Sequence, residues 1–208
     1  MIKIITIERE YGCGGGHIAQ KTADRLGWTL WDDLLTNEIA KLIDCQRADV
    51  KCREERVDPF YYRLFKSVMR GSFEGSANVH RLKLLDADSI FRLTDRVVRK
   101  AAAEGNCVIV GRGAQHFLSD RADTLHIFLF APKEDKVRRL ISEGVNESEA
   151  EEAVDTVDHE RAAFIDKYFH MEWPNRLLYH ALLNTSAGDE TVIQTILSLK
   201  KVLDQQTK

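Results

Sequence analysis

The sequence predicts an α/β fold in which a mostly parallel sheet is covered by helices on both faces. Short apolar runs alternate with segments of helical periodicity along most of the 208 residues, as is typical of parallel sheets. The run at 107–110 is apolar without interruption, as expected for a strand buried on both faces. We therefore expect ligands to bind at the carboxyl ends of the strands, where such sheets form their crevices.

The individual elements follow from hydrophobic periodicity and from the residues that end helices and strands. Strands are expected at 2–7, 28–31, 107–110, 125–130 and 182–186. Helices are expected at 18–26, 34–43, 89–103, 133–169 and 190–203. Within the long segment, Ser142-Glu143-Gly144 indicates a break and Asn146 a new helix cap. We expect one domain with a core at 1–43 and 89–208, a polar helical insertion at 44–88, and a lid at 133–170.

Composition limits the partners that the protein can have. Lys and Arg total 30 against 33 Asp and Glu, so the net charge of −3 provides no basic surface field for nucleic acid or anionic membranes. No apolar run approaches the roughly 18 residues that a membrane span needs. The four cysteines form no C-x-x-C pair, and reduced thiols indicate a cytoplasmic protein. The amphipathic segment 60–70 could form a contact between two copies of the chain, so a homo-oligomer is one expectation.

The first junction between strand and helix has the composition of an anion-binding loop. Residues 8–17 read EREYGCGGGH and follow a run of β-branched residues. Glycines let the backbone turn sharply and direct several N–H groups at one point, and the next helix adds the positive end of its dipole. The residues expected to hold a phosphate group are Arg9, Gly12, Cys13, Gly14, Gly15, Gly16 and His17. Cys13 is expected to serve as a small loop residue rather than as a reactive thiol.

This loop lacks the usual cation. When Gly14 is aligned with the second glycine of the G-x-x-x-x-G-K-[ST] motif, Gly15 occupies the lysine position and Gly16 the position of the hydroxyl residue. Arg9 could reach the phosphates or pair with a neighbouring glutamate, and His17 could donate a hydrogen bond. A dinucleotide-binding G-x-G-x-x-G motif, with Asp32 or Asp33 as its distant carboxylate, is disfavoured because His17 occupies the third glycine position.

Four arginines are candidates for catalysis, because phosphoryl transfer requires several cations around the transferred group. Arg112 lies between two glycines at the end of a predicted strand, where its guanidinium could bind a phosphate or pair with a neighbouring carboxylate. Arg138, Arg139 and Arg161 lie on the helices expected to cover the crevice. For these three, a solvated helix face is the alternative.

Four motifs occur in a fixed order: ITIEREYGCGG at 5–15, VIVGRGA at 108–114, HIFLFAP at 126–132 and DHERAAF at 158–164. Together they resemble the cytidylate kinase-like proteins, which are relatives of bacterial cytidylate kinase among the P-loop nucleoside monophosphate kinases. The resemblance implies a three-layer P-loop fold with a nucleotide-binding insertion and a lid. It also implies phosphoryl transfer from ATP to CMP or dCMP, with Mg²⁺ as the metal.

The same resemblance implies roles for single residues. Asp33 and Arg112 would meet the acceptor, the three lid arginines would supply charge, and Asn184, Thr185 and Ser186 would lie near the donor base. The chain departs from cytidylate kinases proper at the missing loop lysine and at Gly113, where they carry an aspartate. The expected function is therefore a kinase acting on CMP, dCMP or a related small acceptor, and the alternative is a nucleotide-binding regulator with little transferase activity.

Overall fold

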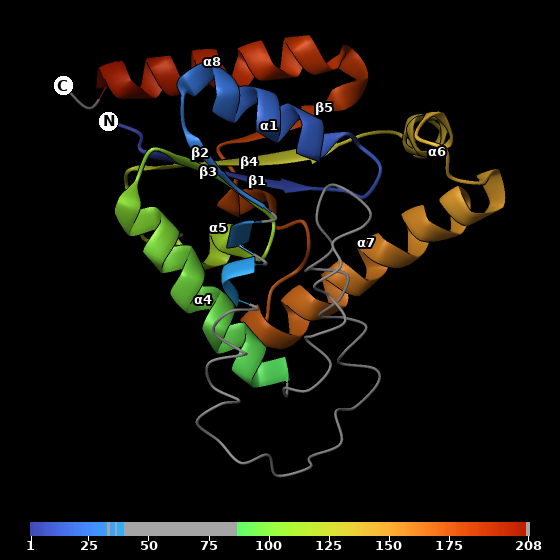
Figure 1. Cartoon of the computed structure of the whole chain (residues 1–208), viewed down its shortest axis with the longest axis horizontal. Helices are drawn as coiled ribbons and strands as arrows, with labels where there is room; N and C mark the ends of the chain where they lie inside the picture. Colours follow the sequence, from blue (N-terminus) through green and yellow to red (C-terminus); the bar gives the residue numbers. More distant parts are fainter. Residues whose placement is uncertain (33, 36, 40–86, 207–208) are drawn as a thin grey trace.

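The computed structural model describes residues 1–32, 34–35, 37–39 and 87–206 (Figure 1). At its centre lies a sheet of five strands, in the order β2-β3-β1-β4-β5, and every pairing between neighbours is parallel. The strands are β1 (Ile4–Arg9), β2 (Thr29–Trp31), β3 (Cys107–Val110), β4 (Thr124–Phe130) and β5 (Ala181–Asn184). The predicted α/β fold with a parallel sheet is therefore confirmed.

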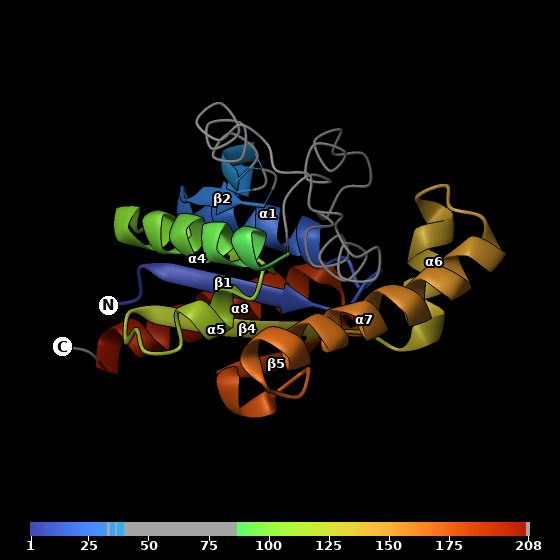
Figure 2. The ribbon, with the colours of Figure 1, turned by 90° about the horizontal axis from the view of Figure 1, so that it is seen from below.

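Helices cover both faces of this sheet, so the protein has three layers (Figures 1 and 2). One face carries α1 (Gly15–Leu26) and α8 (Asp189–Gln206), and the other carries α4 (Ala87–Glu104) and the short α5 (Ala114–Phe117). Beyond the carboxyl ends of the strands lie α6 (Lys133–Ser142) and the first turns of α7 (Glu147–Phe169). Two 3₁₀ turns, η2 (Arg176–Leu178) and η3 (Thr185–Ala187), flank β5. No helix among the described residues is both long and apolar enough to span a membrane.

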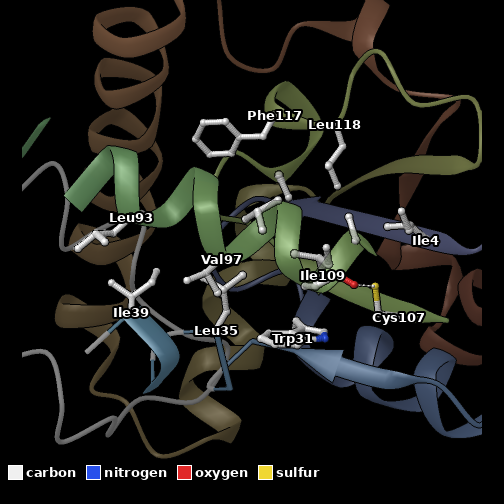
Figure 3. Packing of buried hydrophobic residues seen from close by; sticks show 14 of the residues in the cluster. Ile4, Trp31, Leu35, Ile39, Leu93, Val97, Cys107, Ile109, Phe117 and Leu118 are labelled. Atoms are coloured by element: carbon white, nitrogen blue, oxygen red, sulfur yellow. Dashed lines mark hydrogen bonds between the residues drawn. The ribbon is translucent and has the colours of Figure 1, made fainter. Parts of the chain in front are cut away.

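Each face of the sheet has its own hydrophobic core, because successive side chains of a strand point to opposite faces. In β1, Ile5 and Ile7 pack into the core under α1 and α8, whereas Ile4 packs into the core on the α4 side. Figure 3 shows the second core, where Val97 of α4 and Ile109 of β3 lie among its buried side chains. A third, smaller cluster joins α6 and α7 to the side chain of Tyr11 in the glycine loop. The loop is thus packed against the helices that lie beyond the strands.

Most of the predicted elements are present, with shifted ends. Helix α1 begins at Gly15, three residues before its predicted start, because Gly14 adopts a left-handed conformation (φ 79°) and serves as the N-cap. Sequence patterns place glycine outside helices, which explains the error. The predicted cap at Asn146 is confirmed, since its side chain accepts a hydrogen bond from the Ser148 N–H at 3.0 Å. The four-residue α5 was not predicted, because it is too short to show a helical period.

Several predictions fall wholly or partly outside the described residues. Of the helix expected at 34–43, residues 34–35 and 37–39 are described and are helical. The insertion expected at 44–88 lies outside the described part except for its last two residues, which belong to α4. Asp33, the expected acceptor-binding carboxylate, also lies outside it.

Two histidines, the partly buried His116 and the buried His126, make the stability of this fold depend on pH. Burial lowers the pKa of His116, which stacks on Phe169, from 6.5 to about 4. Burial, with a smaller effect of the His180 charge, also lowers the pKa of His126 to about 4. Below about pH 6.5 these histidines are protonated in the unfolded chain but remain neutral in the folded chain. The free energy of unfolding therefore falls as the pH falls.

We expect each histidine to remove about 1.5 kcal/mol of stability between pH 6.5 and 5. Urea unfolding at the two pH values measures this loss. The variants His116→Gln and His126→Gln should each reduce the loss, and together they should remove most of it. An unchanged loss in the double variant would show that other groups cause it.

Candidate functional site

A pocket of about 540 Å³ opens at the glycine loop, between the start of α1 and the α6–α7 pair. All of the predicted loop residues except Cys13 line it. Two predicted catalytic residues, Arg139 and Arg161, line it as well. The remaining lining residues include Glu10, Glu143 and Asp189, so carboxylates and guanidinium groups share its wall. The structure thus brings together a glycine loop and cations from distant parts of the chain.

The loop backbone suits an anion. Gly12 (φ 77°) and Gly14 (φ 79°) adopt the left-handed conformation that glycine reaches without strain. The first helical hydrogen bond of α1 runs from the Ile18 N–H to the Gly14 C=O, so the preceding N–H groups have no acceptor within the helix. The first turn of α1 contains no acidic residue. The helix dipole therefore favours negative charge at this end of the pocket.

Arg139 brings a positive charge from α6 to this loop. Its Nη2 and Nη1 donate hydrogen bonds to the two carboxylate oxygens of Asp189, at 2.7 Å and 3.1 Å. These bonds raise the pKa of the guanidinium further. A Cβ placed on Gly14 would lie 2.3 Å from Arg139 Nη1, so the guanidinium lies directly against the loop backbone. Asp189, at the first position of α8, thereby orients Arg139 over the pocket.

Arg161 holds α7 against the end of β1. Its side chain is 5% exposed, and its Nη1 donates to the Arg9 C=O at 3.0 Å and to Asp158 Oδ1 at 3.1 Å. The same Asp158 oxygen accepts a hydrogen bond from the Tyr11 N–H at 2.8 Å. Arg161 and Asp158 lie three residues apart on α7, on one side of the helix. The pair therefore fixes the backbone of the loop on both sides of Glu10.

Lys136 of α6 extends this network, although it was not among the site residues predicted from the sequence. Its Nζ donates to Glu10 Oε2 at 2.9 Å and to Asp158 Oδ2 at 3.3 Å. Burial opposes its charge, but the Glu10 hydrogen bond and the Asp158 charge outweigh burial and raise its pKa. The sequence contains no signal that distinguishes this lysine from other charged residues of the same helix. Asp189 was missed for a similar reason, since an acidic residue there indicates only a helix start.

Arg112 is completely enclosed at the end of β3. It is 1% exposed and lies 3.5 Å from the carboxylate of Asp32, which supplies the neighbouring carboxylate considered in the sequence analysis. Its φ of 62° lies in the left-handed region, between two glycines of similar φ. A second cavity of about 10 Å³ lies beside it, and Glu8, Arg9 and Arg161 line that cavity too. Arginines from β1, from α7 and from the turn after β3 thus line one small cavity.

Arg138 is not brought into either cavity. Its side chain is 74% exposed and pairs with Asp135, three residues earlier on α6. It is absent from the residues that line the two cavities. The solvated helix face considered for this residue therefore describes its position.

Residues 184–186 also lie away from the lining of the pocket. Asn184 Oδ1 accepts a hydrogen bond from the Ser186 N–H at 3.0 Å, which caps η3. The Ser186 hydroxyl donates to Asp135, and Thr185 is buried. These side chains stabilise the turn after β5.

Cys13 lies beneath the loop rather than in the pocket. It is 1% exposed, and its Sγ donates weakly to the Leu129 C=O at 3.7 Å. Burial raises the pKa of its thiol to about 12, so the thiolate is scarce at neutral pH. The geometry agrees with the expected small loop residue.

The chain is similar to solved structures over nearly its whole length. The crystal structure of an uncharacterized protein from Eubacterium ventriosum ATCC 27560 is 23% identical, with a TM-score of 0.69, and the match covers 97% of this chain and 99% of that one. A shikimate kinase from Bacteroides thetaiotaomicron is 16% identical, with a TM-score of 0.52 and coverage of 97% and 99%. A shikimate kinase from Acinetobacter baumannii, solved in complex with shikimate, is 15% identical, with a TM-score of 0.51 and coverage of 100% and 97%. At these identities the likeness establishes the fold alone, which this chain shares with the two shikimate kinases.

A comparison with curated proteins gave no match. The sequence model of the cytidylate kinase-like family, in contrast, matches residues 4–187 of this chain. That range contains the glycine loop, the Arg112 turn, and both helices that carry Lys136, Arg139 and Arg161. The chain therefore belongs to the cytidylate kinase-like family.

Proposed function

We propose that this protein binds ATP at the glycine loop and transfers its γ-phosphoryl group to CMP, dCMP or a related small acceptor. The observation that carries the proposal is the pocket of about 540 Å³, in which a helix N-terminus meets guanidinium groups from β1, α6 and α7. Its volume falls in the range of about 300 to 1,000 Å³ that is typical of small-molecule sites. Phosphoryl transfer needs little more from a protein than positioning and charge stabilisation.

The residues suggest a division of labour in this reaction. The loop and Arg139 would hold the triphosphate, and Arg161 and Arg112 would bind oxygens nearer the acceptor. An oxygen of the acceptor phosphate would attack the γ-phosphorus while the bond from that phosphorus to the β–γ bridging oxygen breaks. The products are ADP and the acceptor diphosphate. A phosphate acceptor is already anionic, so this step requires no general base.

The donor set fits ATP better than a metal held by protein alone. Among the described residues, no group of three or more His, Cys, Asp or Glu side chains could hold a metal ion. Glu10 and Asp189 face the pocket, but they bind Lys136 and Arg139. Mg²⁺ would therefore be held mainly by phosphate oxygens, as is common for this ion, and would neutralise part of their charge.

A second candidate function is nucleotide binding without efficient transfer. The formal charges of the pocket wall cancel, because three arginines face three carboxylates: Arg9, Arg139 and Arg161 against Glu10, Glu143 and Asp189. A polyphosphate must compete with Asp189 for Arg139. If Asp189 keeps Arg139, less positive charge reaches the transferred phosphoryl group, which would slow transfer more than it weakens binding.

A direct assay separates the two functions. The protein is incubated with ATP, Mg²⁺ and, in separate reactions, CMP, dCMP, UMP, AMP, GMP or shikimate, and ADP and phosphorylated acceptor are quantified. We expect product with CMP or dCMP, and we expect that Arg139→Ala loses it whereas the exposed Arg138→Ala keeps it. Thermal stabilisation by ATP without any product would support the binding protein. Neither product nor stabilisation would refute both functions.

A further inference from the structure

Compared with a phosphate-loop motif, this chain has a cation where the motif begins with glycine and a glycine where the motif ends with lysine: Arg9 and Gly15. In G-x-x-x-x-G-K, the first glycine precedes the second by five positions, and the lysine follows the second directly. With Gly14 as the second glycine, the first falls at Arg9 and the lysine at Gly15. We propose that Arg9 takes over the phosphate-binding role of the absent lysine, an inference that rests on the proposed ATP site.

The space around Gly15 is occupied by Arg9. Gly15 is the first residue of α1 and is not among the residues of positive φ, so its backbone conformation would accept any side chain. A Cβ placed on it, however, would lie 2.8 Å from both the Cβ and the Cγ of Arg9. Real Cβ atoms essentially never approach that closely. Glycine is therefore required at the lysine position because the Arg9 stem crosses there.

The other end of the same side chain requires a second glycine. A Cβ placed on Gly111, at the end of β3, would lie 2.0 Å from Arg9 Nη1. The side chain thus runs from the end of β1, past the start of α1, to the end of β3. Gly111 also needs glycine for its φ of 63°, so Gly15 is the more specific sign that the chain makes room for Arg9.

The guanidinium reaches the place where the transferred group would lie. Arg9 is 4% exposed and lines both the pocket at the glycine loop and the small cavity that Arg112 and Arg161 also line. Glu8 Oε1 lies 3.6 Å from Arg9 Nη1, so the two side chains form an ion pair. This distance is too long for a hydrogen bond between the two atoms. Two donors of a planar guanidinium can bind phosphate oxygens together, which a lysine cannot do. Arg9 would therefore bind the terminal phosphoryl group of ATP, at the boundary between donor and acceptor.

A reciprocal exchange tests this inference. Affinities for Mg²⁺–ATP and for inorganic tripolyphosphate are measured calorimetrically on the full chain, in wild type, Arg9→Gly, Gly15→Lys and the double variant. We expect each single change to weaken binding about tenfold or more, since one removes the cation and the other collides with the Arg9 stem. The double variant, which restores the usual order of glycine and lysine, should recover to within about threefold of wild type. Arg138→Ala is the matched control and should bind as wild type does.

One further variant keeps the test decisive if the changes at Arg9 prevent folding. Alanine is a better helix former than glycine, so Gly15→Ala should raise the melting temperature if its surroundings are open. We expect it to lower both the melting temperature and the ATP affinity, because its Cβ displaces Arg9. A higher melting temperature with unchanged affinity would overturn the inference.

The outcomes also separate this inference from the proposed function. If wild type binds neither ATP nor tripolyphosphate, the ATP site itself is refuted, and the inference with it. If wild type binds them and Arg9→Gly binds them equally well, the ATP site stands and the role of Arg9 is refuted. A double variant that binds no better than Gly15→Lys would refute that role as well.

Discussion

Replacing Arg161 by alanine is expected both to destabilise the protein and to slow phosphoryl transfer strongly. The change removes the donor to the Arg9 C=O at 3.0 Å and leaves the partly buried Asp158 carboxylate without its guanidinium partner. A buried charge left without any partner costs about 3–5 kcal/mol. Because Lys136 still lies 3.3 Å from Asp158, we expect the loss of stability to fall somewhat below that range. Loss of a cation at the reacting phosphate should lower kcat/KM by about 100-fold or more. Urea unfolding and initial rates with ATP and CMP measure the two effects.

Arg161→Lys separates the structural effect from the catalytic one. A lysine keeps the positive charge and can still pair with Asp158, but it cannot bridge to the Arg9 C=O with the planar geometry of a guanidinium. We expect it to regain part of the stability and little of the rate. Arg138→Ala, an exposed arginine that pairs only within its own helix among the described contacts, should change neither quantity. Wild-type rates in folded Arg161→Ala protein would remove Arg161 from the reaction.

Replacing Arg112 is expected to lower the rate of transfer, and the stability of the variant should depend on which residue replaces it. Its left-handed backbone conformation (φ 62°) costs a residue with a side chain roughly 1–2 kcal/mol, which glycine does not incur. Arg112→Gly should therefore be about 1 kcal/mol more stable than Arg112→Ala, although both lose the ion pair with Asp32. Both variants should lose about 100-fold in kcat/KM, because the guanidinium beside the small cavity is gone.

Comparison of Arg112→Gly with wild type distinguishes a catalytic arginine from a purely structural one. Strain that persists in a fold is a sign of function when its surroundings enforce it, and here two flanking glycines and a buried carboxylate do so. Denaturant unfolding gives the stability difference, and rates under saturating ATP with varied CMP give kcat/KM. If Arg112→Gly were as active as wild type, Arg112 would serve only to hold Asp32.

The order of strands and helices was predictable from local sequence, because each strand is a short apolar run and most helices show a clear period. The glycine loop was predictable for the same reason, since its residues are contiguous. Elements without a period, such as the four-residue α5, could not be found this way. Lys136 and Asp189 could not be found either, because their roles depend on partners in other elements.

The arginines of α6 show where local information ends. Arg138 and Arg139 are neighbours of the same type, and nothing in the sequence ranks one over the other. In a helix, adjacent side chains point about 100° apart, so at most one of them faces a given surface. Packing of α6 against the glycine loop and α8 turns Arg139 to Asp189 and Gly14, and it leaves Arg138 in solvent.

The relation between Arg9 and Gly15 follows the same rule. Composition and periodicity specify a parallel sheet, a glycine loop after its first strand, and the absence of the usual lysine. They leave open whether Arg9 replaces that lysine or pairs with a neighbour, because the answer depends on where its side chain runs in space. Once the chain is folded, two atoms cannot occupy one volume, and the stem of Arg9 fills the space that a side chain at position 15 would need.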